Sequence, residues 1–333
     1  MEGTINIVHC PLGEVGKGIP GGHPVFIICD TNVRYVADRI GLVPEGIFEI
    51  EALEQAKNFN TVLSIDHWLL DKGADRDAFV LGIGGGITTD MVGFAASIYK
   101  RGIRFGFVPT TLLSQVDASI GGKNGVNLDS YKNIIGVIRQ PEVTFICPEP
   151  LSTLPQRQFL SGASELLKTF IIDDGDGNYE KAVSLLALKR YGDLGDLVAA
   201  AAGVKAGIAG RDPQEHGERR LLNLGHTFAH AIEKMSEEKI GHGEAVAMGI
   251  ILAAKLSSRL GLAEEGLAER LEKDFKACGL PVECPFGARE LADAMKKDKK
   301  AQGGKVHFVL PLRIGRVETR SLSPEEAAMI LEK

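Results

Sequence analysis

Cysteine is scarce in this sequence, and its few cysteines form no recognisable pattern. The chain of 333 residues has five cysteines, an odd number, with no C-x-x-C pair. Cys29 in "VFIICD" and Cys147 in "VTFICP" lie in apolar runs, where a buried thiol is the usual interpretation. We therefore expect no framework of structural disulfides, which favours a reducing compartment.

Long apolar runs are also absent. The sequence has no stretch of about 18 consecutive apolar residues, so we expect no membrane span. The opening "MEGTINIVHC" has no basic region followed by an apolar core, so we expect no signal peptide. Together with the cysteine usage, these absences predict a cytoplasmic protein with no membrane partner.

An excess of positive charge is the third absence. The formal net charge is −6, which argues against a non-specific nucleic-acid binder but leaves room for a local basic pocket. Hydrophobic residues make up 44% of the chain and charged residues 25%, an ordinary composition for a globular protein. The length predicts two domains or one large domain.

The first part of the chain alternates short apolar runs with amphipathic stretches. Strands are expected at 24–30, 78–86, 103–111 and 143–147, and helices at 58–73 and 90–99. Strands separated by segments of helix length indicate parallel pairing. This part therefore predicts a Rossmann-like α/β domain over residues 1–150.

The pattern changes after this point. Helices are expected at 156–170, 180–209, 225–235, 242–261, 263–277 and 288–297, and strands only at 305–312 and 315–322. The change in composition predicts a second, mainly helical domain over residues 151–333.

A cluster of glycines joins an expected strand to an expected helix in "GIGGGITTD", residues 82–90. Three consecutive glycines let a backbone approach phosphate oxygens closely, and a helix N-terminus adds unpaired N–H groups. The spacing is not G-x-G-x-x-G, so the usual dinucleotide fingerprint is absent. The cluster indicates either a phosphate site or a tight turn.

The stretch "PTTLLSQVDASIGGKNGVN", residues 109–127, concentrates polar groups, glycines and one lysine in one expected loop region. Lys123 follows a Gly-Gly pair, which suits an anion pocket because glycine leaves room for the ligand. The alternative is a solvated surface loop.

Histidines gather in "LNLGHTFAHAIE" and "GHGEAVAMG". His226 and His230 are four residues apart, so on a helix both rings project from one face, and spacing alone selects them as a pair of metal ligands. Two histidines and one carboxylate with an open position form a common catalytic zinc site. The alternatives are hydrogen-bonded core histidines and, for Glu165, a helical salt bridge with Lys168. The H-E-x-x-H pattern is absent, which argues against a metalloprotease.

Taken together, these segments resemble the 3-dehydroquinate synthase family of sugar phosphate cyclases. The matching stretches, in the order of the family, are "GGGITTDMVGFAAS", "KRGIRFGFVPTTLLSQVDASIGGKNGVN", "KNIIGV", "LSTLPQRQFLSGASELLK", "VKAGIAGRDPQEHGERRLLNLGHTFAHAIE", "GHGEAVAMG" and "DKK". They extend from about residue 24 to residue 315 and cover most of the chain. So many motifs in order make the match specific.

The resemblance implies a fold with an N-terminal α/β domain that binds NAD and a helical C-terminal domain that carries a divalent metal, usually zinc, with cobalt as the other candidate. It implies a homodimer with the active site in the cleft between the domains. It also implies the conversion of 3-deoxy-D-arabino-heptulosonate 7-phosphate to 3-dehydroquinate and phosphate, a step of the shikimate pathway. In that reaction NAD oxidises a hydroxyl, phosphate is eliminated, the ketone is reduced again, and the ring closes by an intramolecular aldol step.

The resemblance also assigns roles to the polar residues of the second domain. Glu165, His226 and His242 match the family's metal ligands, whereas His230 matches its catalytic histidine. Glu215 in "DPQEHGERR" matches a residue regarded as a proton acceptor. A Lewis acid that holds adjacent hydroxyls lowers their pKa, and a nearby neutral imidazole can relay a proton.

Two further sets follow from the resemblance. The substrate contacts would be Arg101, Asp117, Lys123, Asn133, Lys168, Lys205, Arg219, Asn223, His230 and one of Lys299 or Lys300, with Lys123, Asn133, Lys168 and Lys205 also counted as catalytic. The NAD contacts would be Asp30, Asn32, Glu54, Lys57, Gly84, Gly85, Gly86, Asp90, Thr110, Thr111, Asp117, Lys132 and Thr153. In the family the residue that matches Arg101 reaches the neighbouring subunit's site.

The sequence departs from the family pattern at two places. "EALEQAKN" stands where relatives have a loop like "PPGExxK", so Glu54 and Lys57 match but the preceding proline and glycine do not. Asn124 stands where relatives commonly have Thr. Two other activities remain as alternatives: a cyclase of the 2-deoxy-scyllo-inosose or valiolone synthase type, and a polyol dehydrogenase of the glycerol dehydrogenase type.

Overall fold

The computed structural model describes residues 5–129, 131–237, 239–296 and 304–332. The chain forms two compact units, and each is built from two segments. The first unit comprises Met1–Phe159 and Val198–Gln214, and the second comprises Leu160–Leu197 and Glu215–Lys333. The units are therefore interleaved in sequence, which a single change of composition near residue 150 does not reveal. The division into domains 1–150 and 151–333 stays a prediction.

The first unit contains a sheet, its covering helices and a hairpin. Its strands are β1 (Ile7–His9), β2 (Val25–Asp30), β3 (Gly46–Ile50), β4 (Phe79–Gly84), β5 (Arg104–Pro109), β6 (Lys123–Leu128), β7 (Tyr131–Ile138) and β8 (Val143–Ile146). Its helices are α1 (Val15–Gly18), α2 (Arg34–Ala37), α3 (Phe59–Asp71) and α4 (Gly86–Ile98). The strands β1 and β3 were not predicted, and α4 begins at Gly86 where a helix was expected from residue 90.

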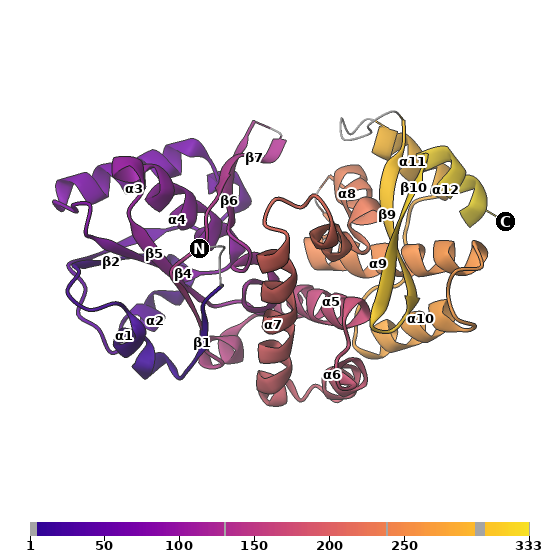
Figure 1. Cartoon of the computed structure of the whole chain (residues 1–333), viewed down its shortest axis with the longest axis horizontal. Helices are drawn as coiled ribbons and strands as arrows, with labels where there is room; N and C mark the ends of the chain where they lie inside the picture. The colour runs from indigo at the N-terminus through magenta and orange to yellow at the C-terminus, as the bar shows by residue number, and fades with distance from the viewer. Residues whose placement is uncertain (1–4, 130, 238, 297–303, 333) are drawn as a thin grey trace. The chain divides into compact units, whose positions relative to one another are not determined.

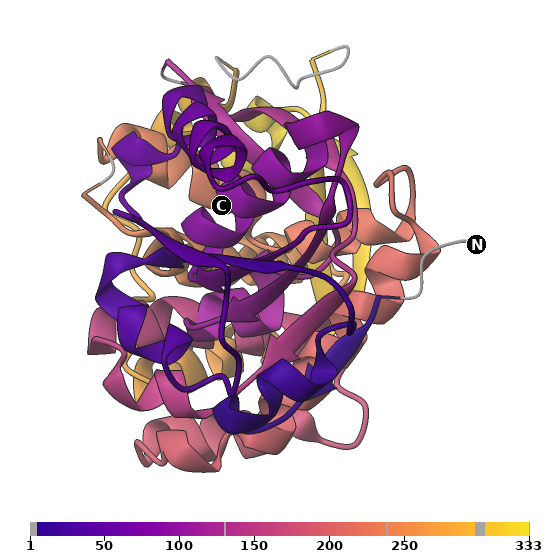
Figure 2. The same ribbon diagram turned by 90° about the vertical axis from the view of Figure 1, so that its left-hand side faces the viewer.

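Six of these strands form a parallel sheet in the order β1-β8-β5-β4-β2-β3. Strands β4 and β8 are buried along their whole length, as parallel strands are when helices cover both faces of a sheet. Helices α3 and α4 pack on one face, and α1 and α2 on the other (Figure 1, and Figure 2 for the view toward this unit). The predicted α/β fold with parallel strands is confirmed.

The strand order places a reversal between β2 and β4. From β2 the chain goes to β3 on one side, and then returns to β4 on the other side of β2. In open α/β sheets, ligands bind at such a point, outside the carboxyl ends of the strands. The carboxyl ends here are Asp30 on β2 and Gly84 on β4.

The expected loop at 109–127 is partly regular structure, which corrects that expectation. Ser114–Ala118 forms a short π-helical turn, and β6 pairs with β7 in an antiparallel hairpin. Gly125 and Gly136 are opposite each other in this hairpin, and a Cβ on either would lie within 2.6 Å of the facing backbone. Such close pairing of two glycines gives no alternation of apolar and polar residues, so the hairpin is not visible in the sequence pattern.

The second unit is mainly helical. Its helices are α6 (Asn178–Ala187), α8 (His226–Met235), α9 (His242–Arg259), α10 (Leu267–Ala277), α11 (Ala288–Lys296) and α12 (Pro324–Leu331), and its strands are β9 (Val306–Arg313) and β10 (Arg316–Leu322). Helices α5 (Gln156–Ile172) and α7 (Gly195–Arg211) each have residues in both units. Strands β9 and β10 form an antiparallel pair beside α9 (Figure 1).

The single helix expected at 180–209 is two helices, α6 and α7. Lys189 has a φ of 55°, and Gly192 and Gly195 follow, so the chain leaves the right-handed helical conformation between them. Helix α12 was not predicted. Within the described part of the chain, no helix is long and apolar enough to cross a membrane.

Three glycines bring α5, α8 and α9 into backbone contact. A Cβ on Gly249 of α9 would lie 2.2 Å from the carbonyl oxygen of Gly225, which precedes α8. A Cβ on Gly243, in the first turn of α9, would lie 2.3 Å from the Cα of Ser161 on α5. Real Cβ atoms do not approach backbone atoms so closely, so these contacts require glycine.

Gly249→Ala should therefore destabilise the second unit. We expect a loss of about 1–3 kcal/mol in the free energy of unfolding, because a methyl group overpacks a contact between two backbones. Denaturant titration followed by circular dichroism measures this loss.

Gly203→Ala is the matched control, since Gly203 is also helical but a Cβ there meets no atom within 4 Å. It should leave stability unchanged or raise it by about 0.5–1 kcal/mol. Equal effects of the two substitutions would contradict this account of the helix contact.

Candidate active site

The carboxyl edge of the parallel sheet carries the first group of predicted NAD contacts. Asp30 ends β2, and its Oδ1 accepts hydrogen bonds from the backbone N–H and the side-chain amide of Asn32, both at 2.9 Å. Gly84 ends β4, Gly85 caps α4 and Gly86 begins it, so the glycine cluster is the N-terminus of a helix of 13 residues. The N–H of Thr110 donates to the carbonyl oxygen of Gly84 and fixes the next loop beside it.

A buried lysine connects a second group. The ammonium nitrogen of Lys57 lies 2.5 Å from Asp90 Oδ2 and 2.6 Å from Asn133 Oδ1. The Lys57 side chain is buried, and burial raises the pKa of Asp90 to about 6 although Lys57 opposes this shift. Asn127 accepts from the N–H of Asn133 and donates to Glu54 Oε1 at 2.7 Å. The network joins segments that are far apart in sequence and includes four predicted site residues.

Other predicted residues of the first unit have their own contacts. Lys205 Nζ lies 2.7 Å from Asp117 Oδ1 and donates to the carbonyl oxygen of Asp117 at 2.6 Å. Thr153 and Tyr35 form a hydrogen bond of 2.9 Å between their hydroxyl groups. Lys123 begins β6 and is exposed, and Lys132 lies at the start of β7.

The second unit contains a compact group of one carboxylate and two imidazoles. Glu165, His226 and His242 each offer one ligand atom, and these atoms lie within 4.8 Å of one another. Glu165 Oε1 is 3.2 Å from His242 Nε2 and 3.5 Å from His226 Nε2, and the Glu165 side chain is fully buried. One oxygen and two imidazole nitrogens are a donor set that zinc and similar divalent metals accept.

The helix contacts place these three residues. His226 directly follows Gly225, and His242 directly precedes Gly243, so each histidine adjoins a glycine of the backbone contacts described above. Glu165 is one turn after Ser161 on α5 and projects from the same face. The N–H of Gly243 donates to Ser161 Oγ at 3.2 Å. The backbone contacts that require glycine therefore fix the positions of the three side chains.

Burial and neighbouring charges separate the protonation states of the group. Burial opposes ionisation of Glu165, but Lys168, whose Nζ is 2.5 Å from Oε2, and the two histidines lower the pKa of the carboxyl well below its usual value. Burial and then Lys168 lower the pKa of His226 to about 3, so its ring is neutral. Burial also opposes the charged form of His242, but hydrogen bonds with Glu165 and Glu233 raise its pKa to about 10.

One predicted catalytic residue, His230, adjoins this group. The rings of His230 and His226 lie 5.8 Å apart between centroids, and His230 is exposed. Glu215 has a left-handed backbone conformation, and its Oε1 accepts from the Asn223 amide at 2.5 Å. Arg219 is buried just before Asn223. Spacing alone would have chosen His226 and His230 as ligands, whereas the structure groups His226 with Glu165 and His242.

Glu244, two residues after His242 in the stretch "GHGEAVAMG", caps a helix. Its Oε2 accepts from the N–H of Gly241 at 2.7 Å, which satisfies a donor at the start of α9. It is not a member of the group of three.

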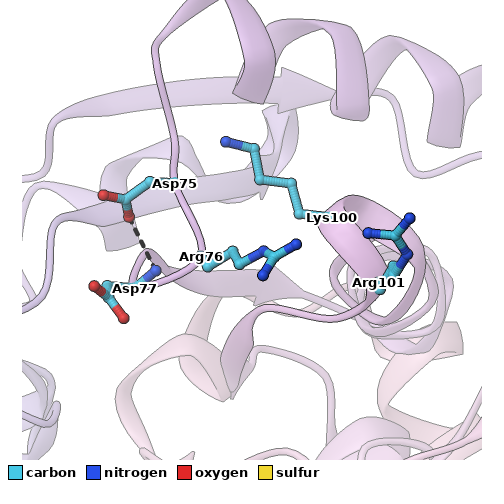
Figure 3. Close-up of a pocket in the computed structure, with 5 residues that line it drawn as sticks. All are labelled: Asp75, Arg76, Asp77, Lys100 and Arg101. Atoms are coloured by element: carbon cyan, nitrogen blue, oxygen red, sulfur yellow. Dashed lines mark hydrogen bonds between the residues drawn. The ribbon is translucent and has the colours of Figure 1, made fainter.

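Arg101 lies at the opposite edge of the sheet. It precedes β5, and with Lys100 it lines a pocket of about 540 Å³ together with Asp75, Arg76 and Asp77, which precede β4 (Figure 3). Lys100 and Arg101 have φ angles of 48° and 68°, a left-handed conformation that ordinary residues seldom adopt. The pocket is at the amino ends of the strands, away from Asp30 and Gly84.

Three polar residues of these networks were not predicted. Glu233 has a signal, because it follows His226 by seven positions and so shares its helix face. Asn127 and Tyr35 have none, because each acts through a contact that tertiary folding creates. Lys299 and Lys300 lie outside the described residues.

Comparisons with known proteins identify the family of this chain. The family model described as 3-dehydroquinate synthase N-terminal matches residues 47–161, and the model described as 3-dehydroquinate synthase C-terminal matches residues 162–301. The 3-dehydroquinate synthase of Alkaliphilus metalliredigens is 41% identical in an alignment of 330 positions that covers 96% of this chain and 92% of that protein.

Two solved structures are also similar over nearly the whole chain. The 2-epi-5-epi-valiolone synthase of Streptomyces hygroscopicus, with NAD+ and Zn2+ bound, has a TM-score of 0.88 and 28% identity, and the match covers 100% of this chain and 97% of that one. A 2-deoxy-scyllo-inosose synthase complexed with carbaglucose-6-phosphate, NAD+ and Co2+ has a TM-score of 0.86 and 25% identity, covering 98% and 96%. Because both family models match the chain and a relative is 41% identical over nearly its whole length, the chain belongs to the 3-dehydroquinate synthase family.

Proposed function

We propose that this chain catalyses the conversion of 3-deoxy-D-arabino-heptulosonate 7-phosphate to 3-dehydroquinate and inorganic phosphate. The observation that carries the proposal is the buried group of Glu165, His226 and His242, with His230 beside it, in a chain of this family. The cofactors are NAD and one divalent metal, zinc or cobalt, as in the two cyclase structures. When bound, these groups supply a reversible hydride acceptor and a Lewis acid.

Glu165, His226 and His242 would hold the metal. The neutral ring of His226 offers the lone pair of Nε2, because its Nδ1 lies 3.1 Å from the carbonyl oxygen of Leu224 and donates to it. The ionised Glu165 contributes a negative charge, and its carboxylate is buried away from solvent. Three protein ligands leave coordination positions for substrate oxygens.

His230 and Glu215 would move protons. His230 is exposed and next to His226, so it can meet a substrate at the metal group and relay a proton from its ring. The amide of Asn223 orients the carboxylate of Glu215 for the same purpose. The cations Lys168 and Arg219 would bind the anionic groups of the substrate.

The first unit would bind NAD at the carboxyl edge of its sheet. Asp30 is at the strand end where a carboxylate meets ribose hydroxyls, and the N-terminus of α4 suits a pyrophosphate. The network of Glu54, Lys57 and Asp90 would shape the same edge. Lys123, Asn133 and Lys205 would add contacts to the sugar phosphate.

Arg101 would act in a partner subunit of a homodimer. Strands β4 and β5 have six residues each, so at about 3.3 Å per residue the two edges of the sheet are about 20 Å apart. An arginine at the amino edge does not reach a ligand at the carboxyl edge of its own sheet. The left-handed turn that carries Arg101 fits a residue held for an external contact.

A second candidate is the activity of another sugar phosphate cyclase, because the two similar structures are of a valiolone synthase and a 2-deoxy-scyllo-inosose synthase. The higher identity to a 3-dehydroquinate synthase, 41% against 28%, favours the first candidate. The carbocyclic product identified by mass spectrometry distinguishes the two.

The proposed reaction has no net change in redox state. Purified protein with NAD, Zn2+ and the heptulosonate phosphate should release phosphate while absorbance at the NADH wavelength stays at baseline. A polyol dehydrogenase would accumulate NADH with glycerol instead. If the protein binds NAD and the metal but releases no phosphate from the heptulosonate phosphate, the proposal is ruled out.

Substitutions of two histidines should separate metal binding from proton transfer. We expect His242→Ala to lose the metal, because one of three ligands is removed. We expect His230→Ala to keep the metal and to lower kcat by about 10²–10⁴-fold, the usual contribution of a general acid or base. Metal content by mass spectrometry and turnover on the same samples measure both effects, and loss of metal in both variants would make the ligand assignment wrong.

Mixing two inactive variants should test the role of Arg101. Arg101→Ala and His230→Ala homodimers should each be nearly inactive. Subunit exchange at equal amounts should restore about one quarter of wild-type sites, because half the dimers are mixed and each has one intact site. No recovery in dimers shown to have exchanged would mean that Arg101 acts within its own chain or not at all.

A further inference from the structure

Helix α8 carries two side chains on one face that matter for the group of Glu165, His226 and His242. His226 is its first residue, and Glu233 follows seven positions later, which is two helical turns and brings both side chains to the same side. Glu233 Oε1 lies 3.3 Å from Nδ1 of His242, while Nε2 of the same ring faces Glu165 at 3.2 Å. The His242 ring is therefore held between two carboxylates from different helices.

We propose that Glu233 is a positioning residue for the metal: its carboxylate binds the outer nitrogen of His242 and thereby fixes the ring that coordinates through Nε2. The inference rests on the proposed function, because it assumes that the group of three binds a metal. A carboxylate that accepts the N–H of Nδ1 leaves the lone pair on Nε2, increases the basicity of the ring and sets its orientation.

The two histidines obtain this support in different ways. His226 donates from Nδ1 to Leu224, whose carbonyl oxygen lies two residues earlier in the same chain segment. His242 begins α9 directly after the cap residue Gly241, and the structure gives its Nδ1 a side-chain partner from another helix. A backbone carbonyl depends on no particular side chain, whereas the support of His242 depends on Glu233.

The charge of Glu233 also matters at this place. His242 lies in the first turn of a helix of 18 residues, where the helix dipole disfavours a bound cation. Lys168 adds a positive charge next to Glu165. Glu165 and the capping carboxylate of Glu244 offset part of these positive contributions, and the carboxylate of Glu233 makes the surroundings of a divalent ion still more favourable.

The burial of Glu233 separates this contact from a surface ion pair. Its side chain is 16% exposed, and the contact joins residues on α8 and α9. Glu237, one turn later in sequence, is 81% exposed and pairs with Lys239. Glu237 therefore provides a matched control at the same end of the helix.

The test measures metal affinity in the full chain with Zn2+ in competition with a chromophoric chelator. We expect Glu233→Ala to raise the Kd for Zn2+ about 10–100-fold, the usual effect of removing a residue that orients a ligand. Glu233→Gln retains an oxygen acceptor but loses the charge, so its Kd should fall between those of Glu233→Ala and wild type. Glu237→Gln should bind Zn2+ as wild type does.

Three further measurements distinguish positioning from general stability. The melting temperature of the metal-free protein should change little in Glu233→Gln, while the rise in melting temperature on adding Zn2+ becomes smaller. In the Co2+-loaded protein, the visible absorption bands should shift, because they report the geometry of the ligands. At saturating Zn2+, kcat should return toward the wild-type value, as expected for a residue that acts through His242.

Zn2+ affinity within twofold of wild type in both Glu233 variants would overturn the inference. If Glu233→Ala does not fold, Glu233→Gln carries the same comparison. A wild-type chain that binds Zn2+ but releases no phosphate would contradict the proposed function and leave the role of Glu233 intact. A wild-type chain that binds no Zn2+ would overturn the role of Glu233 itself.

Discussion

The second unit is organised around one buried charge, the carboxylate of Glu165. Removing an ionised carboxylate from water costs several kcal/mol unless charges and hydrogen bonds compensate for the lost hydration. Here Lys168 comes from the same helix, and His226 and His242 come from two other helices. Three helices therefore have to meet at this side chain, and the backbone contacts at Gly225, Gly243 and Gly249 allow them to do so.

The first unit also contains a buried charge, but a positive one. Lys57 is buried, and Asp90 and Asn133 bind its ammonium group from separate segments. The raised pKa of Asp90 reflects the cost of keeping this pair away from water. Buried charges thus hold separate segments together in both units: the carboxylate of Glu165 in the second and the ammonium group of Lys57 in the first.

The sequence predicted the parallel α/β fold, the helical second half and the residues of the metal group. The fold followed from apolar periodicity, and the group followed from resemblance to a family. Spacing alone would have paired His226 with His230, because two residues of one helix are visible to a pattern, while Glu165 and His242 are 77 positions apart. The His226 ring has Nδ1 against the carbonyl oxygen of Leu224 and Nε2 toward Glu165, an orientation that no spacing encodes.

Other features of the fold could not be predicted from the sequence, because they also depend on contacts between distant segments. The hairpin of β6 and β7 depends on two facing glycines, and the interleaved units depend on where the chain between α5 and α8 packs. The break between α6 and α7 was foreshadowed by Gly192 and Gly195, but glycine in a helical pattern is often tolerated. Contacts such as Asn127 with Glu54 exist only once distant segments have met.

The backbone contact between Gly225 and Gly249, called the joint below, differs from ordinary helix contacts in its response to substitutions nearby. Ordinary helix contacts depend on side-chain size, so a substitution in the core moves the helices slightly and shifts whatever they carry. At this joint the spacing is set by main-chain atoms, which are the same for every residue type. Side chains around the site can therefore diverge, and with them the choice of substrate, while the distance between the two imidazoles stays the same.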